Sequence, residues 1–404
     1  MKSPAITRSW GIVAAVFLLF VGNRASTAQA SQADTITQVV GAPRYPRGGL
    51  LTEILSIGSV DGADPYQFSR IRAVLSASNG TVWIIDDPME SGSIRQFDSA
   101  GRFLRQIGRQ GGGPGEYRLP LGMAELKDGR VIVLDWVGRA LIYKLDGTPD
   151  TTLVFRSRYQ WAEQQPVVDT AGLIWLGIAL APPATRPVSA VAYLRIRPNG
   201  TIVDTVVPPR VPPPQISDVP NMPFQPRVIR VLSPLGFFAT SGSSAYAINF
   251  HRTAGSAPWR AGDRIERIQS NKPLVEMSAE EREDRRKSHE RALGRSGFKT
   301  AVPDFPRTKP AFSSLRFDVD GRLWVFVNTP SERISPSRSG ESASALRWQQ
   351  TQTADVFDRE RRYLGRVVFP DVNFAGSRGD TVWGIAYSPE FVPSFKKYKL
   401  TWQQ

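Results

Sequence analysis

A short hairpin sequence that recurs along the chain constrains the fold more than any other feature. Each copy places a turn residue and a glycine directly before two or three residues that are mostly apolar and often end in tryptophan. An Asn-Gly or Asp-Gly pair between apolar runs is a strong hairpin signal, because both central turn positions tolerate positive φ. The copies lie at 79–83, 128–132, 171–175, 320–324 and, with the order of residues varied, 379–383, with a looser copy at 235–238. Six hairpins of one kind predict six repeated structural units.

Further short apolar runs flank each hairpin. In the first unit, residues 71–75 precede the turn and residues 82–85 follow it, and residues 94–97 and 103–107 supply two more strands. The first two turns are 49 residues apart, a distance typical of four-stranded propeller blades. The sequence therefore predicts an all-β fold, a six-bladed β-propeller.

Two insertions lengthen the later spacings. One is proline-rich and lies near 207–226, and the other is charged and lies near 276–310. The second predicts one short helix at 279–293, with Ser278 and Glu281 in the spacing of a capping box. The helix has little apolar stripe, so we expect it to form a solvated arm on the ring.

The two ends of the chain predict how the ring closes. Residues 51–57 have the pattern of an outermost strand with no inner strands before it, whereas the last unit ends with its third strand at 395–400. A surplus strand at one end thus matches a missing strand at the other. We expect the N-terminal strand to complete the last blade and close the ring, which makes residues 49–404 a single domain.

Residues 107–146 resemble an NHL repeat. The matching positions are Gly108, the run Gly113-Pro114-Gly115-Glu116-Tyr117, Pro120, Asp128-Gly129, Asp135 and Arg139. The first unit matches in part, and the later units keep little beyond the hairpin. The resemblance implies a six-bladed propeller of the exported bacterial type. Propellers of this kind include lyases, lactonases, sugar-binding modules and RNA binders, so the fold does not select a function.

The N-terminus has the pattern of a signal peptide. Lys2 and Arg8 precede a nearly unbroken apolar run at 10–21, and Ala28-Gln29-Ala30 supplies a small-x-small cleavage motif. We therefore expect residues 1–30 to be removed by cleavage near Ala30, with no transmembrane helix left afterwards. Residues 31–48 would form a flexible lead. The mature protein would be exported, either periplasmic or secreted.

Several conspicuous residues have structural interpretations. Asp86 and Asp135 each end a second strand, and Arg95 and Arg139 open the third. Because this pair recurs, we expect it to be structural. The repeated tryptophans are expected in the core between blades, and the glycines of 108–115 are expected to serve backbone geometry. The repeated tryptophans are Trp83, Trp175, Trp324 and Trp383.

The residue inventory excludes several kinds of chemistry. The chain has no cysteine, which excludes disulfides, thiolate metal sites and cysteine nucleophiles. His251 and His289 are the only histidines, so a three-histidine metal site is excluded. We expect His251 at the surface and His289 on the polar helix. No catalytic residue or metal ligand is assigned, and the cofactor is unknown.

Arginines on the predicted innermost strands supply the candidate site. Of the acids there, Glu125 and few others qualify as channel-lining ligands for a divalent metal, whereas arginine recurs. Arg72, Arg230 and Arg316 are expected to converge on one mouth of the central channel and to bind an anionic ligand, because the planar guanidinium matches carboxylate or phosphate. Some of these side chains could instead point outward or neutralise buried acids.

The leading hypothesis is thus an exported binding or interaction scaffold for an anionic small molecule, a polysaccharide or another protein. The formal net charge of +14 would also suit nucleic acid, but the export signal and the lack of a basic run with interleaved aromatics argue against it. One alternative is a metal-dependent propeller hydrolase or lactonase. Another is a surface adhesion or assembly module. We expect a monomer.

Overall fold

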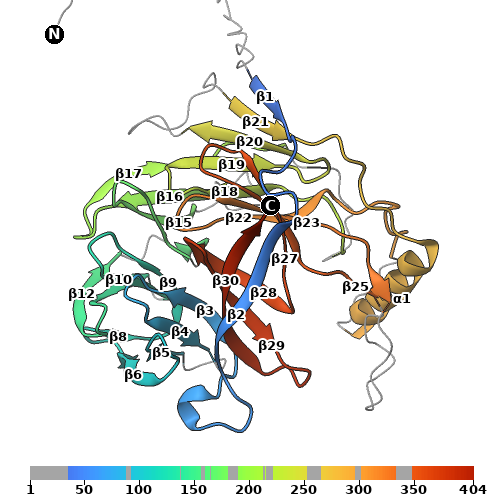
Figure 1. The fold of residues 1–404 in the computed structure, drawn as a ribbon. Helices are drawn as coiled ribbons and strands as arrows, with labels where there is room; N and C mark the ends of the chain where they lie inside the picture. Colours follow the sequence, from blue (N-terminus) through green and yellow to red (C-terminus); the bar gives the residue numbers. More distant parts are fainter. Residues whose placement is uncertain are drawn as a thin grey trace, which may run out of the picture.

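The structure is a computed structural model in which six blades, each built on four antiparallel strands, are arranged around a central axis (Figure 1). The last two blades are joined edge to edge in one eight-stranded sheet. The described residues are 35–87, 92–136, 138–155, 160–163, 165–180, 190–212, 214, 222–252, 265–295, 302–333 and 348–404. The predicted signal peptide at 1–30 and its cleavage site lie outside them. The predicted all-β six-bladed propeller is confirmed.

Blades 1 and 2 are joined by the glycine-rich connector. Blade 1 contains β3 (Ile71–Ser76), β4 (Val82–Asp86), β5 (Ser93–Phe97) and β6 (Phe103–Ile107), and blade 2 contains β9 (Pro120–Glu125), β10 (Val131–Asp135), β11 (Arg139–Tyr143) and β12 (Pro149–Val154). The 3-10 turn η1 (Asp64–Tyr66) precedes β3, and β7 (Arg109–Gln110) pairs with β8 (Glu116–Tyr117) in the connector. Gly108 and Gly115 have φ of 57° and 69°, so these glycines do serve backbone geometry.

Blades 3 and 4 follow around the ring. Blade 3 contains β14 (Val167–Val168), β15 (Ile174–Leu180), β16 (Ala190–Ile196) and β17 (Ile202–Val206), and β13 (Gln160–Trp161) pairs with the far end of β15. Blade 4 contains β18 (Ile229–Leu232), β19 (Phe237–Ser241), β20 (Ala247–Arg252) and β21 (Ile265–Gln269). Outside β21 lies one more strand, β1 (Thr35–Val39), in parallel pairing (Figure 1).

Strand β1 differs from the flexible lead predicted for 31–48. Its sequence Thr-Ile-Thr-Gln-Val alternates in the manner of a strand. By pairing with β21 it covers an edge that would otherwise present unpaired backbone groups to solvent. Part of the lead is therefore a fifth strand of blade 4.

Blades 5 and 6 complete the ring. Blade 5 contains β22 (Phe312–Phe317), β23 (Leu323–Val327), β26 (Thr353–Phe357) and β27 (Tyr363–Val368), with the small hairpin of β24 (Glu332–Arg333) and β25 (Trp348–Gln349) between its second and third strands. Blade 6 contains β28 (Val372–Arg378), β29 (Thr381–Tyr387), β30 (Pro393–Gln403) and β2 (Gly48–Ile57). Strand β2 pairs antiparallel with β30 from Gly48 opposite Gln403 to Ile57 opposite Phe395. The predicted closure by the N-terminal strand is confirmed.

The repeated side chains have the structural roles expected of them. All four tryptophans are buried between blades, with at most 3% of their surface exposed. Asp86 and Arg95 form an ion pair at 3.2 Å, and Asp135 and Arg139 form one at 2.7 Å. Asp135 also accepts hydrogen bonds from the backbone N–H groups of Arg118 and Leu119. Each aspartate therefore fastens the preceding connector to its blade.

The helix of the second insertion is not the solvated arm that its polarity predicted. Helix α1 (Ala279–Arg295) begins after Ser278, whose Oγ accepts a hydrogen bond from the backbone N–H of Glu281 at 3.0 Å. Glu281, Arg285 and Leu293 are buried. Leu293 belongs to a small apolar cluster in which residues of the two insertions pack together: Met222, Phe224, Leu293, Val302 and Phe305. The insertions support each other, which the helix sequence alone does not reveal.

Candidate functional site in the central channel

A cavity of about 380 Å³ lies on the axis of the ring. Residues from all six innermost strands line it, one example from each being Leu75, Glu125, Val168, Leu232, Phe317 and Arg378. These residues lie near the ends of their strands, close to the turns of the repeated hairpins. The volume falls within the roughly 300–1,000 Å³ common for small-molecule sites. The ring axis is therefore hollow enough at this end to hold a ligand.

The acidic groups of this cavity are already paired. Glu125 accepts a hydrogen bond from the backbone N–H of Ser78 at 2.9 Å and one from Nη2 of Arg378 at 2.6 Å. Asp318 accepts hydrogen bonds from Nε of Arg322 at 2.7 Å and from Oγ of Ser377 at 2.7 Å. Because these carboxylates already accept hydrogen bonds from protein groups, they are not free to bind a cation as well.

Arg72, the first of the three predicted site residues, pairs with an acid of its own blade. Asp87 accepts hydrogen bonds from both Arg70 and Arg72, with the Nε of Arg72 at 2.8 Å. Burial acts to raise the pKa of Asp87, but the hydrogen bonds and charges of the two arginines prevail and hold this pKa below its usual value. Arg72 thus neutralises a buried acid, which was one of the two alternatives that the sequence left open.

Arg230 and Arg316 lie on neighbouring innermost strands, β18 and β22, and their side chains are exposed. Within the described part of the chain, neither guanidinium group forms a hydrogen bond or an ion pair. Both exert their charge on the same carboxyl group, that of Glu163. Two of the three predicted arginines, Arg230 and Arg316, thus lie close enough to Glu163 for their charges to lower its pKa.

Glu163 was not predicted as a site residue. It follows β13, and its Oε1 accepts a hydrogen bond from the hydroxyl of Tyr193 at 2.5 Å. Burial raises the pKa of Glu163, while the bond from Tyr193 and the charges of Arg316 and Arg230 partly offset this effect. Its one sequence signal was that it is the only acid between Asp150 and Asp169.

The three predicted arginines do not share the cavity on the axis. Arg72, Arg230 and Arg316 are all absent from its lining. Arg72 lies on blade 1 with Asp87, and the other two lie on blades 4 and 5. Convergence of all three on one ligand stays a prediction, and the pair Arg230–Arg316 is the part that the geometry favours.

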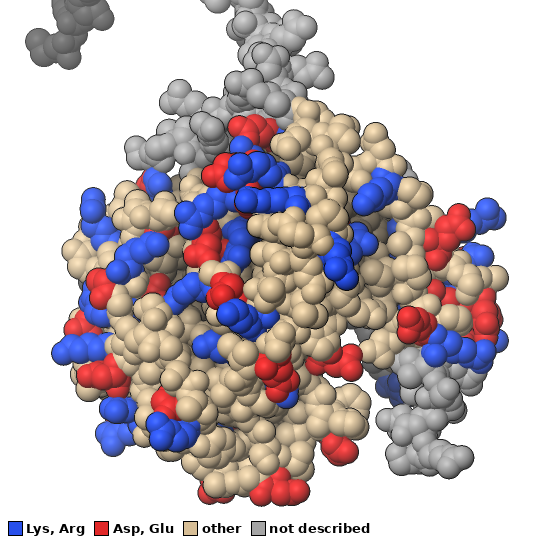
Figure 2. Space-filling model, viewed as in Figure 1, with Lys and Arg blue, Asp and Glu red and all other residues tan. Residues whose placement is uncertain are grey.

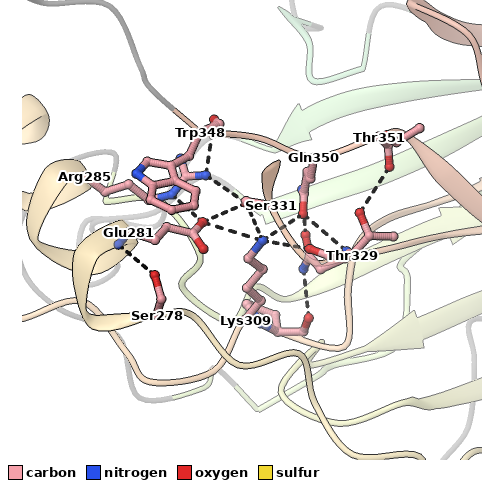
Figure 3. Close-up of polar contacts among 11 residues, drawn as sticks. Ser278, Glu281, Arg285, Lys309, Thr329, Ser331, Trp348, Gln350 and Thr351 are labelled. Atoms are coloured by element: carbon pink, nitrogen blue, oxygen red, sulfur yellow. Dashed lines mark hydrogen bonds and ion pairs between the residues drawn. The ribbon is translucent and has the colours of Figure 1, made fainter. Parts of the chain in front are cut away.

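A second polar cluster lies beneath helix α1 (Figure 3). The fully buried ammonium group of Lys309 donates hydrogen bonds to the backbone carbonyl of Thr329 and to Oγ of Ser331, both at 2.7 Å. Ser331 in turn donates to Glu281 at 2.7 Å, and Arg285 donates to the same Glu281 oxygen at 2.8 Å. Burial and the charge of Arg285 lower the pKa of Lys309, and Glu281 opposes them.

The arrangement of Ser331 and Lys309 has the residue types of a nucleophile and its base. The directions of the hydrogen bonds argue for a structural role, because Ser331 accepts from Lys309 and Arg285 and gives its own proton to Glu281. Arg285 and Lys309 also lie over the ring of Phe224, at 4.8 and 5.1 Å from its centroid. The cluster therefore fixes α1 and the proline-rich insertion to blade 5.

The prediction that His251 lies at the surface is wrong. The residue is 6% exposed and forms a 2.7 Å hydrogen bond with Oγ1 of Thr240. It lies on β20, which is covered on both edges by β19 and β21. Burial lowers the pKa of His251 to about 4. Its position after Phe250 at the end of a predicted strand gave no sequence signal of this burial.

The described residues show a surface of mixed charge and no cluster of metal ligands. On the face shown in Figure 2, acidic side chains lie beside basic ones over much of the ring. In that part of the chain, no group of three or more histidine, aspartate or glutamate side chains is placed to hold a metal ion. None of the described helices is long and apolar enough to cross a membrane.

One family model agrees with the architecture. A family model described as a six-bladed β-propeller matches residues 63–155. No curated protein matches the chain. A solved structure of a proposed exported protein from Bacteroides fragilis is 11% identical, with a TM-score of 0.46 and coverage of 92% of this chain and 100% of that chain.

Two further solved structures are similar at this level. A member of the DUF4221 family from Bacteroides vulgatus is 9% identical, with a TM-score of 0.48 and coverage of 88% of this chain and 99% of that chain. A proposed gluconolactonase is 11% identical, with a TM-score of 0.41 and coverage of 89% and 96% respectively.

Proposed function

We propose that this protein is an exported binding propeller whose central channel holds a small anionic ligand between Arg230 and Arg316. The observation that carries the proposal is that these two exposed arginines, on neighbouring innermost strands, both act on the half-buried carboxyl group of Glu163 without forming an ion pair among the described residues. Export is inferred from the N-terminal signal pattern. We also infer that residues 107–146 form a repeat of the NHL type.

The chemistry of the two arginines favours an oxyanion. Guanidinium groups present planar donor pairs that match carboxylate and phosphate oxygens, and they stay charged at any physiological pH. Their position on innermost strands limits a ligand to the width of the channel, which favours a small molecule or a chain end over a folded protein. Arg72 is a more distant contributor, because Asp87 already engages it.

The carboxylate of Glu163 competes with an anionic ligand for the charges of Arg230 and Arg316. Its carboxyl group lies where both arginine charges reach it. A negative charge there opposes a second anion, whereas the protonated acid does not. Anion affinity should therefore increase as Glu163 takes up a proton, and removing its charge should have the same effect at neutral pH.

Calorimetric titration with inorganic phosphate at low ionic strength tests the proposal. The wild type should bind phosphate, the double variant Arg230→Gln/Arg316→Gln should bind at least tenfold more weakly, and Glu163→Gln should bind more tightly. Arg102→Gln is the control, since Arg102 is 82% exposed and paired with Asp98 on the rim. Equal phosphate affinity in the wild type and the double variant, or no binding by any of them, would overturn the proposal.

A further inference from the structure

We propose that the cavity on the ring axis is a second, separate binding site, which takes a small carboxylate with an apolar body and holds it with Arg378 and Trp383. Both residues line the cavity at its blade 6 side. The site of the proposed function involves other strands, and none of its three arginines lines this cavity. The two proposals can therefore fail independently.

Among the described residues, Trp383 lacks the hydrogen bond that the indole N–H groups of the other three repeated tryptophans make. The indole N–H of Trp83 donates to Oγ1 of Thr81 at 3.3 Å. The indole N–H of Trp175 donates to Asp169 at 2.8 Å, and that of Trp324 donates to Asp318 at 3.2 Å. In both blades the acceptor lies six residues before the tryptophan. The equivalent residue before Trp383 is Ser377, whose hydroxyl donates to Asp318 of the neighbouring blade instead.

The indole N–H of Trp383 is consequently a buried donor for which the described residues supply no acceptor. The side chain is only 3% exposed. Buried donors are nearly always paired in native proteins, and a polar group without a partner suggests an acceptor from a ligand or water. Because this group lies against a cavity, a ligand can supply the acceptor.

Arg378 adds a second donor of the same kind. Its Nη2 is bound to Glu125 at 2.6 Å, which fixes the orientation of the guanidinium group. Its Nη1 is buried and has no acceptor among the described residues. Lys127 is a further cation on the cavity wall. The three carboxylates of the wall, Glu125, Asp318 and Asp320, each accept hydrogen bonds from the protein's own donors. The two unpaired donors therefore await an oxygen from a ligand, and an anionic oxygen accepts the strongest hydrogen bonds.

The remaining wall decides what the rest of the ligand is. It includes apolar side chains such as Val74, Met123, Val167 and Phe317. Gly376 lies beside the indole, and a Cβ at this position would come within 3.1 Å of its Nε1. A side chain at this position would therefore crowd the polar edge of the indole. An apolar body with one carboxylate therefore fits both the walls and the donors.

Benzoate is a suitable probe, and benzyl alcohol offers the same ring without the carboxylate. The wild type should bind benzoate by calorimetry and should bind benzyl alcohol at least tenfold more weakly. Trp383→Phe should weaken benzoate binding about tenfold, the usual effect of losing one hydrogen bond to a charged group. It should also leave the fold intact, because the lost N–H has no protein partner. Trp83→Phe is the matched control, since Trp83 is outside the cavity lining and should leave the affinity unchanged.

An NMR measurement separates binding in the cavity from binding elsewhere. The indole N–H resonance that is missing in Trp383→Phe should move downfield in the wild type as benzoate is added. Arg378→Gln should abolish that movement, and Arg230→Gln/Arg316→Gln should leave it unchanged even if phosphate binding is lost. The proposal is wrong if the Trp383 resonance does not respond at saturating benzoate, or if Trp383→Phe and Arg378→Gln bind benzoate as the wild type does.

Discussion

His251 should make the folded protein sensitive to mild acid. Its pKa in the folded state is about 4, because burial disfavours the charged imidazolium, whereas an unperturbed histidine has a pKa of 6.5. Above pH 7 the imidazole is neutral in both states and contributes no pH dependence. Between pH 6.5 and pH 4 the unfolded chain binds a proton that the folded protein does not, so stability decreases as the pH falls.

The size of this effect follows from the two pKa values. A difference of about 2.5 in pKa corresponds to about 3 kcal/mol when both transitions are complete. At pH 5 the loss is about 2 kcal/mol, since the unfolded state is then largely protonated and the folded state is not. This is a large fraction of the roughly 5–15 kcal/mol by which domains are stable.

The assay is urea unfolding of the wild type and of His251→Gln at several pH values from 7.5 to 4. Glutamine can keep a hydrogen bond to Thr240 but does not titrate. All other ionisable groups are common to both proteins, so the difference in their free energies of unfolding isolates His251. We expect this difference to be constant above pH 7 and to shift by about 2 kcal/mol in favour of the variant at pH 5.

The control is His289→Gln, which removes the only other histidine, the one on α1. The free energy of unfolding of this variant should decrease between pH 7.5 and pH 4 as that of the wild type does. If the difference between wild type and His251→Gln does not change between pH 7.5 and 4, the histidine is not held neutral inside blade 4, and the argument from its burial is refuted.

Two further predictions concern the connector and the insertion. Gly108→Ala should cost about 1–2 kcal/mol of stability, because φ is positive and the new Cβ would lie 2.6 Å from the carbonyl oxygen of Gly115, whereas Gly112→Ala, with open space around it, should have little effect in the same urea titration. Lys309→Met should leave Glu281 and Arg285 with an incomplete buried network, so hydrogen exchange should show faster amide exchange in α1 while the blades stay protected. Unchanged protection of α1 in this variant would show that the network does not hold the helix.

The repeated architecture was predictable because it is encoded locally. Each hairpin places a glycine where positive φ is needed, and the structure has this conformation at Gly80, Gly129, Gly172, Gly236, Gly321 and Gly379. Closure was predictable because counting strands at the two ends requires no distance information. Burial of the four tryptophans followed from their equivalent positions in the blades.

The residues that make the site and the insertions were predictable only in part. Arg230 and Arg316 could be assigned to innermost strands, but their common acid, Glu163, lies in an irregular segment of blade 3. The burial of Glu281 depends on partners at Lys309 and Ser331, which are distant in sequence. A polar helix looks solvated when its own pattern is considered alone, and only tertiary packing reverses that expectation.

The repeats also indicate where function is to be sought. In a regular blade each polar group of the repeat is satisfied within the ring, as Asp135 with Arg139 and Trp324 with Asp318 illustrate. Selection for stability alone gives no reason to leave a buried donor unpaired in one copy when the others pair it. Trp383 is such a copy, and it lies where all six blades meet around a cavity. In blade 6 a serine of β28, Ser377, rather than an aspartate lies six residues before the tryptophan, and its hydroxyl donates elsewhere. A Ser377→Asn variant should keep an N–H donor for Asp318 and offer its amide oxygen to the indole, which should reduce benzoate affinity if the unpaired donor is what the ligand uses.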